Sequence, residues 1–183
     1  TLESGFQQQW GYMGADWAVM GGRYVFLMPK QPVPNQSNVD SVAVSFRLPN
    51  DWDVYTPWPE EDGVYYPSTE TRDILDHLGR TSFAFGDFDL YSRMIGTTEV
   101  MIAVHGSFSS HLKETLAQQA WDIIGYHTSV FDTSVGDYYL VLYFPKAPDG
   151  RRVNVEEWSN SQGFSPDISF DGELMMPGGI FSH

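Results

Sequence analysis

The segment that most constrains the fold is DYYLVLYFP, residues 137–145, because it is apolar along nearly its whole length. A strand with one solvated face alternates between apolar and polar residues, so an uninterrupted apolar run predicts a central strand that is covered on both faces. A second run, TEVMIAVHG at residues 98–106, places Val100, Ile102 and Val104 on one face. We therefore expect two neighbouring strands of one sheet.

The chain between these two runs has the period of a helix. In SSHLKETLAQQAWDIIGYH, residues 109–127, apolar residues recur at three- and four-residue spacing, at Leu112, Leu116, Ala120, Ile123 and Ile124. Ser109 or Ser110 can cap its first turn, and Gly125 is a candidate stop. Residues 98–145 thus predict a strand–helix–strand unit, in which one long helix crosses over a sheet.

The remaining segments favour further strands. Residues 23–30 predict a short buried strand, residues 41–49 alternate as a half-buried strand does, and residues 51–67 predict strand, loop, strand. Residues 69–80 predict a short helix that Thr69 caps and Gly79 ends, and residues 81–92 predict another strand. The predicted class is α+β and β-rich: a β-sheet or sandwich domain over residues 1–96, then a mixed sheet with one long crossover helix over residues 97–183.

The composition excludes several classes of function. The chain has 24 acidic and 10 basic residues, and its net charge of -14 argues against nucleic acid and anionic membrane surfaces as partners. It contains no cysteine, so disulfides, thiolate catalysis and zinc–cysteine sites are excluded. No apolar run approaches the roughly 20 residues of a membrane-spanning helix.

The candidate chemical groups are few. His105 and His111 flank GSFSS, but no carboxylate stands at metal-ligand spacing from them. The same stretch lacks the second glycine of G-x-S-x-G, so a nucleophilic serine is not indicated. The chain contains no H-E-x-x-H motif either. We identify no complete set of catalytic residues.

An aromatic and acidic stretch offers a binding function instead. DWDVYTPWPEED combines Trp52, Tyr55 and Trp58 with five carboxylates. Such a set could form a platform for a sugar ring, although tryptophans on neighbouring strands commonly belong to the core. The alternative function is therefore a non-catalytic carbohydrate- or peptide-binding β module.

Three segments together resemble a known family. They are GYMGADWAVMGGRYVFLMP, then VAVSFRLPNDWDVYTP, then EVMIAVHGSFSSHLKETLAQQAWDIIGYHTSVFDTSVGDYYLVLYFP, over residues 11–145. This order is similar to that of the glycyl aminopeptidase family of zinc metallopeptidases. The resemblance implies a β-rich N-terminal domain that leads into a thermolysin-like catalytic domain, and a peptide as substrate.

The resemblance also assigns two residues. The family's substrate-holding edge segment, G-G-[LM]-E-H, falls near SNSQGFSPDIS, where Gly163 remains but the glutamate and histidine do not. His183 matches the first zinc histidine of H-E-x-x-H, and the other ligands are missing from this chain. We expect zinc to bind only when a downstream segment or a second chain completes the site.

These observations predict the scaffold portion of a zinc aminopeptidase-like protein, inactive as it stands. A partial domain with an open sheet edge also favours pairing with another strand, so a homo-oligomer or a second chain is a further expectation.

Overall fold

The protein is described here by a computed structural model, which covers residues 9–27, 39, 41–67, 74–131, 136–147, 153–155, 161–164, 167–168 and 174–175. The strands are β1 (Gln9–Trp10), β2 (Tyr12–Met13), β3 (Trp17–Gly21), β4 (Asp53–Tyr55), β5 (Glu60–Glu61), β6 (Val64–Tyr65), β7 (Ser82–Gly86), β8 (Phe88–Ile95), β9 (Thr98–His105), β10 (Tyr138–Tyr143), β11 (Val153–Val155), β12 (Ser161–Phe164), β13 (Asp167–Ile168) and β14 (Leu174–Met175). The helices are α1 (Gly22–Val25), α2 (Ile74–Gly79) and α3 (Ser110–Phe131).

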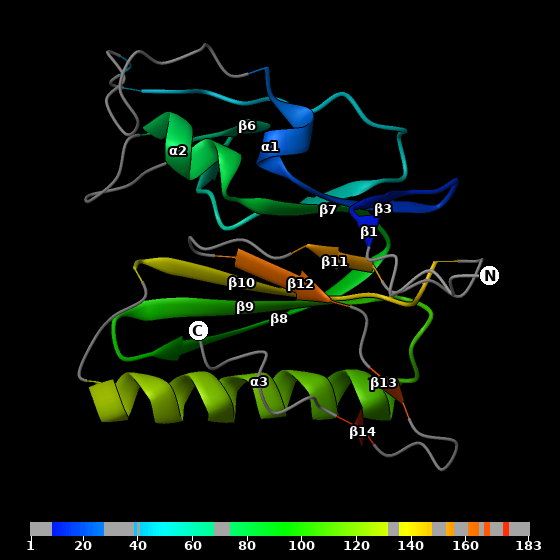
Figure 1. The fold of residues 1–183 in the computed structure, drawn as a ribbon, viewed down its shortest axis with the longest axis vertical. Coiled ribbons are helices and arrows are strands. Elements are labelled where there is room, and N and C mark those ends of the chain that lie inside the picture. The colour runs from blue at the N-terminus through cyan, green and yellow to red at the C-terminus, as the bar shows by residue number, and fades with distance from the viewer. Residues whose placement is uncertain are drawn as a thin grey trace, which may run out of the picture.

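The larger sheet has six strands in the order β1-β11-β12-β10-β9-β8. Its centre is parallel, because β10 runs parallel to both β9 and β12. Strand β8 is antiparallel to β9, and β11 is antiparallel to β12. Helix α3 connects β9 to β10 and lies along one face of this sheet (Figure 1). The predicted α+β, β-rich class with one long crossover helix is therefore confirmed.

Strand β10 is covered on both faces, as its continuous apolar sequence predicts. Leu140 and Leu142 pack into the core on the face away from α3, whereas Val141 and Tyr143 pack into the core under α3. All four side chains are fully buried. On the neighbouring strand β9, the predicted face of Val100, Ile102 and Val104 also lies in the core under α3.

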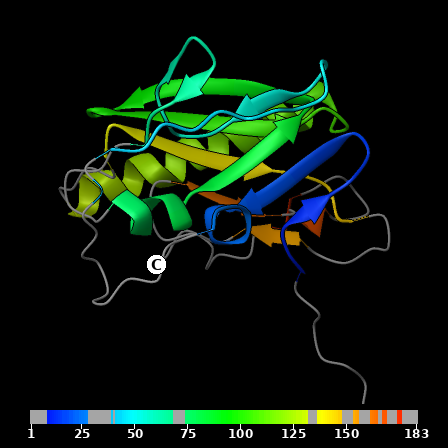
Figure 2. The same cartoon turned by 90° about the horizontal axis from the view of Figure 1, so that it is seen from above.

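A second, antiparallel sheet covers the face of the six-stranded sheet that α3 leaves free. Its four strands have the order β2-β3-β7-β4. Trp17 of β3, Tyr55 of β4 and Ala84 of β7 contribute to the core between the sheets. The outer face of the four-stranded sheet carries a third core, which α2 and the segment around β6 complete. Figures 1 and 2 show this layered arrangement from two directions.

Three local predictions need correction. The expected buried strand at residues 23–30 begins instead with α1. Among its described side chains, Leu27 is fully exposed and Tyr24 is 57% exposed, whereas Phe26 packs against Trp58 and Phe83. The segment at residues 41–49 alternates in burial as predicted, yet it pairs only through a bridge between Val44 and Tyr65.

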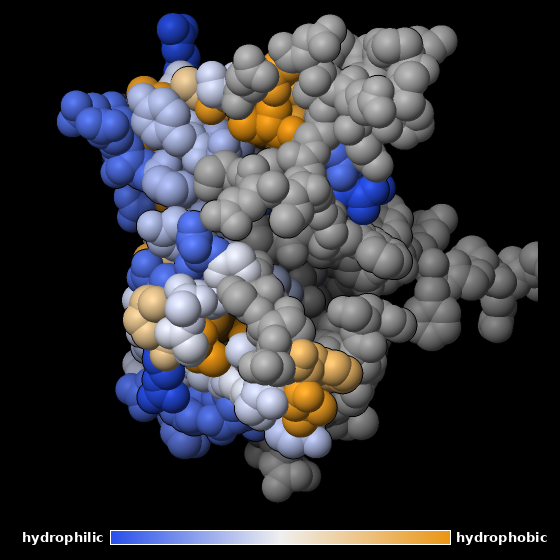
Figure 3. Space-filling view, turned by 90° about the vertical axis from the view of Figure 1, so that its left-hand side faces the viewer, coloured by the Kyte–Doolittle hydropathy of each residue, from blue (hydrophilic) through white to orange (hydrophobic). Residues whose placement is uncertain are grey.

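The third correction concerns the end of α3. The helix continues through Gly125 to Phe131, because a single glycine costs a helix only about 1 kcal/mol, which is too little to end it. Its last residues are apolar and exposed, Val130 at 53% and Phe131 at 66%. Figure 3 views this end of the molecule, where small apolar patches stand among hydrophilic atoms.

The two sheets join at Gly86 and Asp87. β7 ends at Gly86 in the four-stranded sheet, and β8 begins at Phe88 in the six-stranded sheet. Gly86 has a φ of 117°, which side chains disfavour, and a Cβ there would lie 2.5 Å from the carbonyl oxygen of Asp16. The proposed division into residues 1–96 and 97–183 stays a prediction.

We predict that Gly86→Ala lowers the free energy of unfolding by about 1–3 kcal/mol, the usual cost of a strained backbone position. Gly125→Ala is the matched control, because a Cβ at Gly125 meets only Ile95 at 3.9 Å. Alanine in mid-helix is favoured over glycine, so this control should gain up to about 1 kcal/mol. Urea unfolding of both variants measures the difference, and equal effects would contradict a requirement for glycine at the junction.

Candidate functional site at the carboxyl edge of β9 and β10

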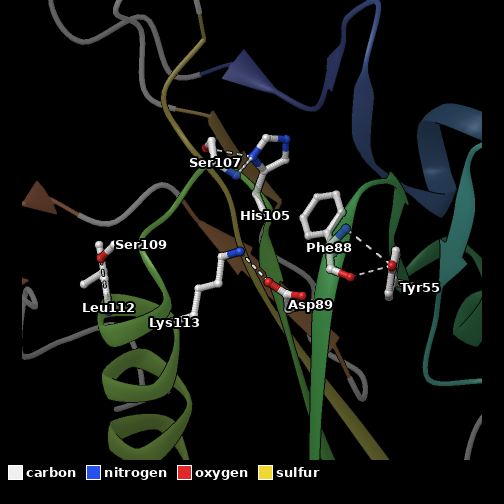
Figure 4. A network of polar contacts seen from close by, with 8 residues as sticks. All are labelled: Tyr55, Phe88, Asp89, His105, Ser107, Ser109, Leu112 and Lys113. Carbon is white, nitrogen blue, oxygen red and sulfur yellow. Dashed lines mark hydrogen bonds and ion pairs between the residues drawn. The ribbon is translucent and has the colours of Figure 1, made fainter.

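The edge at which β9 and β10 end is the place where an open sheet of parallel strands presents its ligands. β9 ends at His105, and residues 106–109 lead into α3. β8 begins at the same edge, because Phe88 lies opposite His105. Figure 4 shows the polar contacts that gather here from β4, β8, β9 and α3.

His105 is held by the turn that follows it. Its Nδ1 accepts a hydrogen bond from the backbone N–H of Ser107 at 3.1 Å and lies 2.8 Å from the Ser107 hydroxyl. Since an amide N–H can only donate, Nδ1 is an acceptor and the neutral ring carries its proton on Nε2. The ring packs against Trp17 and Phe88, with centroid distances of 5.1 and 5.2 Å.

Burial sets the protonation of His105. Removal from water lowers the pKa of the imidazole below its ordinary value, and the Lys113 ammonium lowers the pKa further. The carboxylates of Asp87 and Asp16 act in the opposite direction but do not reverse the shift. His105 is therefore neutral at pH 7 and offers a hydrogen-bond donor at Nε2.

Lys113 ties the start of α3 to the sheet. Its side chain is buried, and its ammonium contacts the Asp89 carboxylate on β8, which is half-exposed. Ser109 caps the helix, because its hydroxyl accepts a bond from the Leu112 N–H at 3.4 Å. Lys113 and Ser109 at the beginning of α3 are thus engaged in contacts inside the molecule, whereas His111 is exposed.

Tyr55 connects β4 to the first residue of β8. Its hydroxyl donates to the Phe88 carbonyl at 2.6 Å and accepts a bond from the Phe88 N–H at 3.3 Å. Burial is the main cause that raises the pKa of the phenol, so the proton stays in place for the bond to Phe88. One hydroxyl therefore satisfies both backbone groups of Phe88.

The three aromatic residues of the predicted platform lie in different places. Tyr55 is 8% exposed and belongs to the core between the sheets. Trp58 is 4% exposed, lies in the third core and packs on Phe83, while Trp52 is only partly buried at the margin of that core. The structure does not bring these rings together, so a carbohydrate-binding role for them stays a prediction.

Gly163 lies in β12, opposite Leu142 of β10. A Cβ at this position would lie 2.9 Å from the ring of Phe144 and 3.0 Å from the Leu142 Cβ, so the packing of β12 on β10 requires glycine. Its role in binding substrate stays a prediction. His183 lies outside the described residues.

The described residues do not fit a zinc site. A catalytic zinc needs three protein ligands, and in the part of the chain that the structure describes no three His, Asp or Glu side chains converge for a metal. His111 is exposed and does not join His105 in a ligand set.

Sequence reasoning missed the two contacts that organise this edge. The signal for one of them was present, because Lys113 shares a helix face with Leu116, Ala117 and Ala120. Because a buried charge is almost always paired, a lysine on an apolar face predicts a partner of opposite charge. The Tyr55 bond to Phe88 has no comparable signal, since it joins two strands of different sheets that are 33 residues apart.

Neither a protein-family profile nor a curated protein matches the sequence. Among solved structures, the crystal structure of an aminopeptidase N family protein from Idiomarina loihiensis is similar, with a TM-score of 0.59 at 16% sequence identity. The match covers 85% of this chain but only 26% of that protein's chain. The likeness shows an aminopeptidase-like fold. No helix in the described ranges is long and apolar enough to cross a membrane.

We predict that Tyr55→Phe lowers the free energy of unfolding by about 1–3 kcal/mol, because it leaves two buried backbone groups without a partner. Tyr126→Phe is the matched control, since that side chain is 66% exposed. Denaturant unfolding of the two variants provides the comparison. If they are equally stable, the hydroxyl of Tyr55 does not join the sheets as described.

His105 should make stability depend on pH. Because the folded pKa is lowered, the unfolded chain binds more protons, so the contribution to stability is fully present above about pH 6.5 and falls as the pH drops toward the lowered folded pKa. The variant His105→Asn replaces the imidazole with an amide, whose oxygen can accept the bond from the Ser107 N–H and which does not titrate. We expect the stability of the parent to fall more steeply than that of the variant between pH 7 and 5. Parallel urea-unfolding profiles would refute the assignment.

Proposed function

We propose that this chain is the framework portion of an aminopeptidase-like protein, which supports a peptide-cleaving site that the described residues do not complete. The observation that carries the proposal is the similarity of fold over 85% of the chain to an aminopeptidase N family protein. The resemblance of residues 11–145 to the glycyl aminopeptidases, which rests on the order of strands and helix, points in the same direction.

The chain contains part of what a zinc peptidase needs, and the rest would come from other residues. A zinc peptidase needs three protein ligands for the metal and an open position for water. The described residues contain no such cluster, and the sequence contains no H-E-x-x-H. What the chain contributes is a parallel strand–helix–strand unit, β9-α3-β10, with β12 and β11 beside it. Such a unit can support a site that further residues supply.

The experiment compares this 183-residue chain with the complete product of its gene. We expect the complete product to hold zinc in stoichiometric amount and to release p-nitroaniline from amino-acid p-nitroanilides, an activity that a chelator removes. The 183-residue chain should bind zinc weakly and release none. Elemental analysis and the release of p-nitroaniline measure both.

Two outcomes would overturn the proposal. Chelator-sensitive cleavage by the 183-residue chain alone would show that it already holds a complete site. A complete gene product without zinc and without cleavage of any free-amino substrate would show that the shared fold serves another function.

A further inference from the structure

Strand β8 forms one edge of the six-stranded sheet, because β9 is its only neighbour among the described strands (Figure 1). An edge strand directs half of its backbone N–H and C=O groups away from the sheet. Two observations identify which residues these are in β8.

The first observation is the bond from the Gly106 N–H to the Asp87 carbonyl at 2.9 Å, in the register that continues the pairing of β8 with β9. Asp87 therefore faces β9. The second is that both backbone groups of Phe88 bond to the Tyr55 hydroxyl, which lies on the other side (Figure 4). In an antiparallel pair the two directions alternate along the strand. Leu90, Ser92 and Met94 must then direct their backbone groups outward.

These three residues define what we name the open edge. At the start of β8 the open edge is limited by Tyr55, whose hydroxyl occupies the backbone groups of Phe88. At the end of β8 it is limited by the turn at Gly96. Their side chains lie on the face away from α3, where Leu90 is 53% exposed, Met94 is 59% exposed and Ser92 is also exposed. The open edge thus combines backbone groups that pair with no other described strand with exposed apolar side chains.

We propose that the open edge pairs with the open edge of a second copy of this chain, antiparallel and centred on Ser92. In this register Ser92 lies opposite Ser92 of the second copy, and Leu90 lies opposite its Met94. It is the symmetric register that uses all three outward residues of each copy, and it forms roughly six backbone hydrogen bonds. The two sheets then become one continuous sheet.

The side chains of β8 support a second copy as the occupant. Each exposed apolar side chain, Leu90 or Met94, faces the other type across the twofold axis. On the α3 face, Tyr91 lies opposite Arg93 of the second copy, and Asp89 is diagonal to that same arginine. No like charges face each other within the paired strands. The sequence of the edge is therefore complementary to itself, which a partner of another kind would not require.

Charge repulsion and a small interface area both limit the affinity of the pairing. Each copy carries a net charge of -14, so salt should strengthen the dimer by screening the repulsion. A pair of short strands also lies at the small end of specific interfaces, so we expect a dissociation constant in about the micromolar range.

Cysteine cross-linking tests the register, because the native chain contains no cysteine. Hydrogen-bonded partners on antiparallel strands have Cα atoms about 5.5 Å apart, within the range that a disulfide spans. Ser92→Cys should therefore form a disulfide-linked dimer under mild oxidation. Leu90→Cys is the matched control, because in this register its two copies lie four positions apart, roughly 13 Å, and should not cross-link. Non-reducing electrophoresis, from low to high protein concentration, measures the two yields.

Sedimentation velocity tests the pairing without a cross-link. Ser92→Pro removes an outward N–H and keeps every bond between β8 and β9, and an edge strand tolerates proline at such a position. Met94→Lys serves if the proline variant does not fold. Either variant should remain monomeric at concentrations where Ser92→Ala dimerises as the parent does. The proposal fails if the parent is a monomer throughout, if a dimer persists in both edge variants, or if the two cysteine variants cross-link equally.

Discussion

A strand that is apolar on both faces can be stable only between two layers, and strand β10 imposes this condition on the whole molecule. Helix α3 provides one layer and the four-stranded sheet provides the other. The amphipathic character of α3 and the apolar residues that β3, β4 and β7 direct toward the six-stranded sheet follow from the same need. The four-stranded sheet then has an outer face of its own, which α2 and the segment around β6 cover.

The carboxyl edge of β9 and β10 shows how this layering uses chemical groups. His105 packs between aromatic rings, Lys113 holds Asp89, and Ser109 caps α3. Each group could serve a ligand, yet each has a structural task that follows from where the layers meet. These polar groups therefore stabilise the fold at this edge of the sheet.

Much of the layer structure could be predicted from the sequence, because periodicity reports burial directly. The apolar run of β10, the alternation in β9 and the helical repeat of α3 each have a distinct pattern, and each element occurs where its pattern indicates. The failures have physical causes. Residues 22–25 pack against α2 as helix α1 in place of the predicted strand, and a single glycine at position 125 costs too little to end α3.

The candidate site was less accessible to sequence reasoning. An aromatic residue close to two tryptophans, Tyr55 fits the pattern of a binding residue, whereas its hydroxyl joins two sheets. Contacts between residues far apart in the chain depend on how layers stack, which no local pattern encodes. Gly163 was named through a family motif, and the structure adds the steric reason for a glycine there.

The junction at Gly86 and Asp87 has a mechanical consequence. Because β7 and β8 follow each other with a single intervening residue, a load applied to one sheet reaches the other through the covalent backbone, without a compliant linker to absorb it. Tyr55 bonds the first residue after this junction and thereby reinforces it. Sliding of one sheet over the other is thus opposed at the end of the molecule at which His105 lies, and at the other end of β7 the Ser82 N–H donates a hydrogen bond to the Ser161 hydroxyl of the six-stranded sheet.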